Sequence, residues 1–83
     1  MGVAAPNGIS GLQCRMARAG LRWNLRDLEQ HAKVSRMTIV RFEGEVAKTT
    51  SANIAALRRA FEAAGVEFVE NYGVHIRKPP EAR

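Results

Sequence analysis

The stretch that decides the fold is residues 24–44, which read NLRDLEQHAKVSRMTIVRFEG. Asn24 is a good N-cap for a short helix over residues 25–32. A two-residue turn follows, and Ser35 caps a second short helix that ends near Gly44. The positions expected in the core are Leu28, Ala32, Val34, Ile39 and Phe42. The stretch therefore predicts two short amphipathic helices joined by a tight turn.

Two further helices are predicted, one on each side of this pair. They cover residues 10–19 and 51–64, where apolar residues recur at spacings of three and four. Ser and Thr are preferred as N-caps, and glycine is preferred just past a helix end. The residues expected to bound the two helices are Ser10, Gly20, Thr50 and Gly65.

After Gly65 the spacing of apolar residues changes to two. Alternation on both sides of Asn71-Tyr72-Gly73 predicts a β-hairpin over residues 66–77 with a three-residue turn. Two strands alone are marginally stable, so the hairpin either packs on the helices or pairs with a second chain. The predicted organisation is a flexible arm over residues 1–8, one domain over residues 9–77 and a flexible tail over residues 78–83.

The chain of 83 residues is 46% apolar and 25% charged, the composition of an ordinary globular domain. Its net charge is +5, and the excess is uneven. Residues 1–59 hold ten Lys and Arg against four Asp and Glu, whereas residues 60–83 hold three against four. A basic body of this kind predicts that one part of the molecule faces a polyanion.

Several classes of site are not expected. Cys14 is a lone cysteine, so it has no disulfide partner, and a helical apolar filler is the simplest role for it. His31 and His75 lack metal-ligand spacing, and no nucleophile and base can be paired, so we expect no metal, cofactor, small-molecule ligand or enzymatic activity. No run is long and apolar enough to span a membrane, and no signal peptide opens the chain, which predicts a cytoplasmic protein.

The joint spacing of residues over the central stretch resembles the helix-turn-helix of Cro/repressor-type transcriptional regulators, also called the xenobiotic-response-element family. The resemblance covers residues 10–69. It implies a lambda-repressor-like, mainly α bundle of four to five helices with the hairpin at its C-terminal end. The segments that carry it are Asp27-Leu28, Ala32-Lys33-Val34-Ser35-Arg36, Thr38-Ile39 and Arg41-Phe42-Glu43-Gly44, with Gln13-Cys14-Arg15, Arg18, Trp23, residues 55–60 and residues 62–68 around them.

The resemblance implies which residues would contact DNA. An α-helix fits the major groove, and its N-terminal residues approach the base edges. The base-reading positions carried over from the family are Ser35, Arg36, Met37 and Arg41. Phosphate contacts are expected from the N-terminus of the preceding helix, from the turn, from Thr38 of the reading helix and from the loop after that helix. The residues are Asn24, Arg26, Lys33, Thr38, Lys48, Thr49 and Thr50. Arg18 and Glu43 are implied to form a structural, partly buried ion pair.

Three residues depart from the family's pattern. Leu25 stands where a phosphate-binding glutamine is usual. Glu29 replaces the alanine at the crossing of the two helices, so its carboxylate is expected to bend outward. Lys33 replaces the glycine of the turn and would adopt a left-handed conformation at a cost of about 1–2 kcal/mol. These departures predict atypical docking or weaker affinity rather than loss of the fold.

The expected function is a dimeric, sequence-specific and autoregulatory repressor on an inverted-repeat operator. The resemblance implies a phage or another mobile element as its context. Two alternatives stay open: an antitoxin that also binds DNA, and a protein-interaction module such as an anti-activator that has lost DNA binding. Leu25 and Glu29 are the residues that favour the interaction module. The homodimer interface is expected to use Phe61, Phe68, Val69, Val74 and Ile76.

Overall fold

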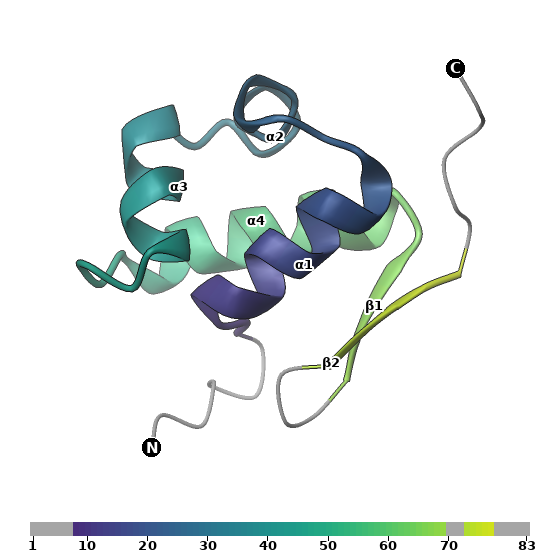
Figure 1. Cartoon of the computed structure of the whole chain (residues 1–83). Helices are drawn as coiled ribbons and strands as arrows, with labels where there is room; N and C mark the ends of the chain where they lie inside the picture. The colour runs from purple at the N-terminus through teal and green to yellow at the C-terminus, as the bar shows by residue number, and fades with distance from the viewer. Residues whose placement is uncertain (1–7, 70–72, 78–83) are drawn as a thin grey trace.

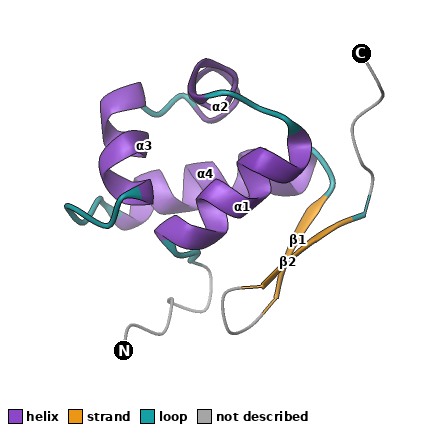
Figure 2. Ribbon diagram, in the orientation of Figure 1, coloured by secondary structure: helices purple, strands orange, loops and turns teal. Residues whose placement is uncertain are grey.

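The computed structural model describes residues 8–69 and 73–77. They form four helices followed by a two-stranded antiparallel hairpin, so the mainly α class with a C-terminal hairpin is confirmed (Figures 1 and 2). Residues 1–7 of the expected arm over residues 1–8, the residues Asn71 and Tyr72 of the expected turn, and the tail over residues 78–83 lie outside the described residues. The elements are α1 (Gly11–Leu21), α2 (Leu25–Ala32), α3 (Arg36–Glu43), α4 (Ser51–Ala63), β1 (Val66–Val69) and β2 (Gly73–Ile76).

Each helix begins at the residue that the sequence predicts. In all four the N-cap side chain accepts a hydrogen bond from the backbone N–H three residues on, which satisfies a donor that the helix itself leaves free. In α1 and α2 the third helical residue also bonds back to the cap, which completes a capping box. The four caps are Ser10, Asn24, Ser35 and Thr50.

Two boundary predictions are wrong. Gly20 does not follow α1 but lies within its last turn, because Leu21 is buried and the helix continues to it. The left-handed residue that ends α1 is Arg22 (φ 59°). Gly73 is not in the hairpin turn either, because it pairs with Val69 as the first residue of β2.

The core lies between α1, α3, α4 and the hairpin, with α2 packed against α3 and α4. Its largest fully buried side chains include Phe61 and Leu57 of α4, Leu28 of α2 and Ile39 of α3. Trp23 stacks between His31 and Phe61, with ring centroids 4.2 and 5.7 Å apart. Because Phe61 is 0% exposed within a single chain, its expected place in a dimer interface is wrong.

The hairpin packs on the helices, β1 against α4 and β2 against α1 (Figure 1). Gln13 of α1 holds it in place, since the Nε2 amide donates to the backbone oxygens of Val69 (3.1 Å) and Gly73 (2.9 Å). Both oxygens flank the loop of the hairpin, so one buried side chain ties the ends of both strands to α1. The inward-facing residues are Val66, Phe68, Val74 and Ile76.

No helix among the described residues is both long and apolar enough to cross a membrane.

Candidate nucleic-acid interface

The turn between α2 and α3 depends on one residue in a left-handed conformation. Lys33 has φ 60°, and its backbone N–H bonds to the carbonyl of Glu29, which ends α2. The left-handed turn expected for this lysine is therefore present. Val34 follows and is buried, so the connection is held from the inside while the side chain of Lys33 stays exposed.

Helix α3 has one buried and one exposed side. Ile39, Phe42 and Glu43 face the core. The outer side carries Arg36, Met37, Val40 and Arg41, all exposed, with Met37 60% and Val40 44% exposed. We call these four residues the outer strip of α3. Spacings of one, three and one bring them together along the helix.

The outer strip contains three of the four expected base-reading residues and one that the sequence interpretation missed. Val40 follows Met37 at a spacing of three, so helical periodicity alone could have placed it there. It adds a second apolar side chain between two arginines. The strip therefore combines cationic donors with apolar groups, and both kinds of side chain can contact base edges.

Ser35 lies at the end of this strip as the N-cap. Its hydroxyl accepts from the backbone N–H of Thr38 (3.2 Å) and donates to the Oγ1 of Thr38 (2.9 Å). The hydroxyl thus donates one bond and accepts one bond inside the helix, which makes Ser35 a capping residue in the free chain. Thr38, expected near a phosphate, is half-buried and takes part in the same contact.

The Glu29 carboxylate lies at the exposed surface, in agreement with the expected outward bend. It spans the turn: Oε2 accepts from the backbone N–H of Arg36 (3.2 Å), and Oε1 pairs with the guanidinium of Arg36 (3.3 Å). The physical reason is that the first N–H groups of α3 have no partner within the helix, so a nearby acceptor is drawn to them. Arg36 is therefore held in an ion pair with Glu29, whereas no ion pair involves Arg41 within the described part of the chain.

The residues expected at phosphates are spread over three places. Asn24 and Arg26 lie exposed at the start of α2, although the Asn24 side-chain oxygen is used to cap Asp27. Lys48 is exposed in the segment that leads from α3 to α4. Thr49 accepts from the Asn53 side chain (2.8 Å), and Thr50 caps α4. The cations of this set, Arg26, Lys33 and Lys48, are all exposed.

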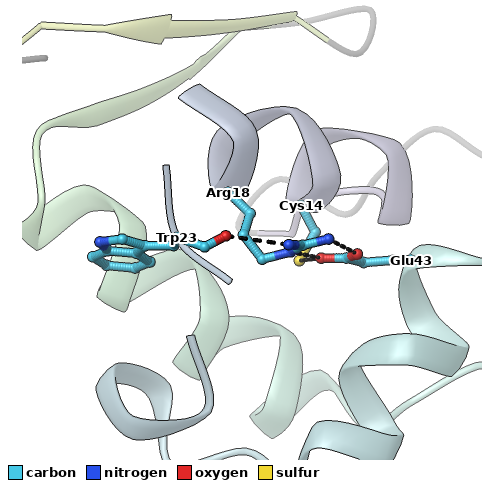
Figure 3. A network of polar contacts seen from close by, with 4 residues as sticks. All are labelled: Cys14, Arg18, Trp23 and Glu43. Carbon is cyan, nitrogen blue, oxygen red and sulfur yellow. Dashed lines mark hydrogen bonds and ion pairs between the residues drawn. The ribbon is translucent and has the colours of Figure 1, made fainter. Parts of the chain in front are cut away.

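The orientation of α3 is held by a polar network that joins it to α1 (Figure 3). Arg18 forms two parallel bonds to Glu43, from Nε to Oε2 and from Nη2 to Oε1, both 2.9 Å long. Its Nη1 also donates to the backbone oxygen of Trp23 (3.2 Å). The side chain of Glu43 is 6% exposed and that of Arg18 23% exposed, so the implied pair is present and partly buried. The hydrogen bond to Glu43 raises the pKa of Arg18.

Cys14 completes the network. Its Sγ lies 3.3 Å from the Oε2 of Glu43 and donates to it. Burial, and then the negative charge of Glu43, raise the pKa of the thiol far above its ordinary value. A thiol that stays protonated in the core is a poor nucleophile, so Cys14 serves packing and the network.

Within residues 8–69 and 73–77 no group of three or more His, Cys, Asp and Glu side chains is arranged to hold a metal ion. Every buried side-chain nitrogen and oxygen in the same part of the chain has a hydrogen-bond partner.

No protein-family model matches the chain, and no curated protein matches it.

Proposed function

We propose that the protein is a sequence-specific, double-stranded DNA-binding transcriptional regulator in which α2 and α3 form a lambda-repressor-like helix-turn-helix. The observation that carries the proposal is the outer strip of α3. It presents Arg36, Met37, Val40 and Arg41 to solvent while the opposite side of the helix is buried. An arginine can pair with the O6 and N7 acceptors of guanine, and an apolar side chain can contact a thymine methyl group.

The support of α3 agrees with this role. A reading helix must be held rigidly, because a small displacement removes its base contacts. Glu43, at the C-terminal end of α3, is joined to Arg18 of α1 by two bonds, and Ser35 caps the other end. The net charge of +5 and the exposed cations near α2 and α3 favour a polyanionic partner.

A salt series tests the proposal. Binding of a labelled duplex is measured by fluorescence anisotropy between about 50 and 200 mM salt, and binding that releases counterions from several phosphates weakens steeply over this range. No binding at low salt, or binding independent of salt, would refute the DNA-binding function.

A substitution on the outer strip tests its role. Arg41→Ala is expected to weaken binding to a selected operator by about five- to 150-fold, which corresponds to the roughly 1–3 kcal/mol of a bidentate guanine contact. It should also relax the preference at one base pair. Arg59→Ala is the matched control, because Arg59 is an exposed arginine on α4 and its loss changes the net charge equally. Equal losses for both variants would contradict the placement of α3 in the groove.

We further propose a homodimer, since one α3 contacts few base pairs and a two-fold dimer reads an inverted repeat. Of the residues expected at its interface, Val69 is 49% exposed, whereas Phe68, Val74 and Ile76 are partly buried against their own helices. Val69 is thus the residue of this set most available to a second copy. Analytical ultracentrifugation of Val69→Asp against the unmodified chain tests this surface, and an unchanged dimer would exclude it.

Two observations favour the second candidate, a protein-interaction module without DNA binding. Leu25 is half-buried against the core and cannot donate to a phosphate, while the Glu29 carboxylate occupies Arg36. The salt series separates the two candidates, because an interaction module shows no salt-dependent binding to duplex DNA.

A further inference from the structure

Glu29 forms a contact that links α2 to the outer strip of α3. Its two carboxylate oxygens bind the same residue at two points, the backbone N–H of Arg36 at 3.2 Å and the guanidinium at 3.3 Å. The side chains of Arg36 and Glu29 are 54% and 35% exposed. The pair is therefore within reach of solvent, and of any ligand that approaches the strip.

The two hydrogen bonds of this contact have different effects. The bond to the backbone N–H caps α3, next to the bond that Ser35 makes to Thr38. The bond to the guanidinium restrains the Arg36 side chain and cancels its charge locally. The bond engages only Nη2 of the guanidinium, so its other N–H groups stay free to bind an acceptor on DNA, and the negative charge of Glu29 then lies close to the duplex.

We propose that Glu29 is a specificity-determining positioning residue, which weakens the attraction of Arg36 to phosphates and orients its free N–H groups toward a base that offers two acceptors. The inference rests on the proposed DNA-binding function. A single phosphate contact gains little, because Glu29 already balances the charge of the guanidinium and its own negative charge lies near the phosphate. A guanine edge adds two hydrogen bonds in a fixed geometry, so a site with guanine at that position recovers the loss. Glu29 thus lowers affinity for arbitrary DNA more than affinity for the operator.

The test compares Glu29→Gln with the unmodified chain on a random-sequence duplex and on an operator obtained by in vitro selection. The glutamine amide keeps an oxygen that can accept from the Arg36 N–H, so the cap is retained and only the charge is lost. We expect Glu29→Gln to bind the random duplex about two- to fivefold tighter, because an exposed ion pair contributes an effect of this size. The salt dependence should steepen by about 0.9, the value for one added phosphate contact. Affinity for the operator should change less.

Glu45→Gln is the matched control. Glu45 is exposed just after α3, and its substitution raises the net charge by the same amount while the contact between Glu29 and Arg36 stays intact. Placing Glu29→Gln in an Arg36→Gln background isolates the coupling, since without the arginine the substitution should do no more than Glu45→Gln does.

The outcomes separate this inference from the proposed function. If Glu29→Gln and Glu45→Gln raise the affinity for random DNA equally, net charge explains the effect and the positioning role is refuted. If the unmodified chain does not bind DNA but Glu29→Gln does, the positioning role is supported in its strongest form. If no variant binds in a salt-dependent way, the proposed function fails, and the inference fails with it.

Discussion

Gly11, at the start of α1, lies where α1 and α3 approach each other closely. A Cβ atom added there would lie 2.1 Å from the backbone oxygen of Phe42 and 3.2 Å from the Cα of Glu43. Both atoms belong to the backbone of α3, which cannot avoid the added Cβ by changing rotamer as a flexible side chain can. The Gly11→Ala substitution must therefore move α1 away from α3 by about 1 Å to reach ordinary carbon contact distances.

The expected cost follows from two opposing effects. Overpacking of a tight contact costs about 1–3 kcal/mol, and alanine regains up to about 1 kcal/mol of helix propensity. Because Gly11 is the first residue of the helix, the regained part is small, and we expect a net loss of about 2 kcal/mol. For a domain of this size that corresponds to a Tm lower by roughly 8–16 °C. The displacement should also strain the bonds between Arg18 and Glu43.

Gly20→Ala, at the other end of α1, is the matched control. A Cβ there would meet only the Cδ1 (3.0 Å) and Cγ1 (3.1 Å) of Ile76, the far end of a flexible side chain. We expect this variant to be neutral or up to about 1 kcal/mol more stable, because it gains helix propensity. Urea denaturation followed by circular dichroism measures both variants. Equal stabilities of Gly11→Ala and Gly20→Ala would refute the close contact between α1 and α3.

Two further predictions concern buried polar groups. The pKa of Cys14 is raised above its ordinary value of 9.0, so above pH 9 the unfolded thiol loses its proton while the folded one keeps it. Stability should therefore fall by up to about 1.4 kcal/mol per pH unit above pH 9, and Cys14→Ala should lack this decline in urea titrations at pH 8, 9 and 10. Gln13→Ala removes the donors to Val69 and Gly73, which should cost about 1–3 kcal/mol and speed amide exchange in the hairpin. Gln30→Ala on the exposed side of α2 is its control, and equal exchange rates in both variants would contradict the role of Gln13.

Local signals predicted most of the element boundaries. A Ser, Thr or Asn cap acts through a hydrogen bond three residues along the chain, so the starts of all four helices could be read directly. The errors arose where a tertiary contact outweighed a local preference. Burial of Leu21 extends α1 past Gly20, and pairing with Val69 draws Gly73 into β2.

Some features of the candidate site could likewise be predicted from the sequence, whereas others depended on tertiary contacts. Periodicity assigned Ile39 and Phe42 to the core, and the resemblance picked out Arg36, Met37 and Arg41, which lie exposed on α3. Neither the periodicity nor the resemblance could show that Phe61, on the apolar stripe of α4, is covered by its own chain and not by a second copy. An apolar stripe has the same sequence pattern whichever surface covers it.

The stretch over residues 24–44 by itself determined two short helices, their caps and the side of each that is apolar, since these depend on interactions within about four residues. Only the tertiary structure decided how α3 is held and which of its arginines is engaged. The bonds from Arg18 to Glu43 span 25 residues, and the pair of Glu29 and Arg36 depends on the path of the turn through Lys33. Hydrogen bonds and ion pairs act over a few ångströms in space, and distances in space are set by the packing of the whole chain.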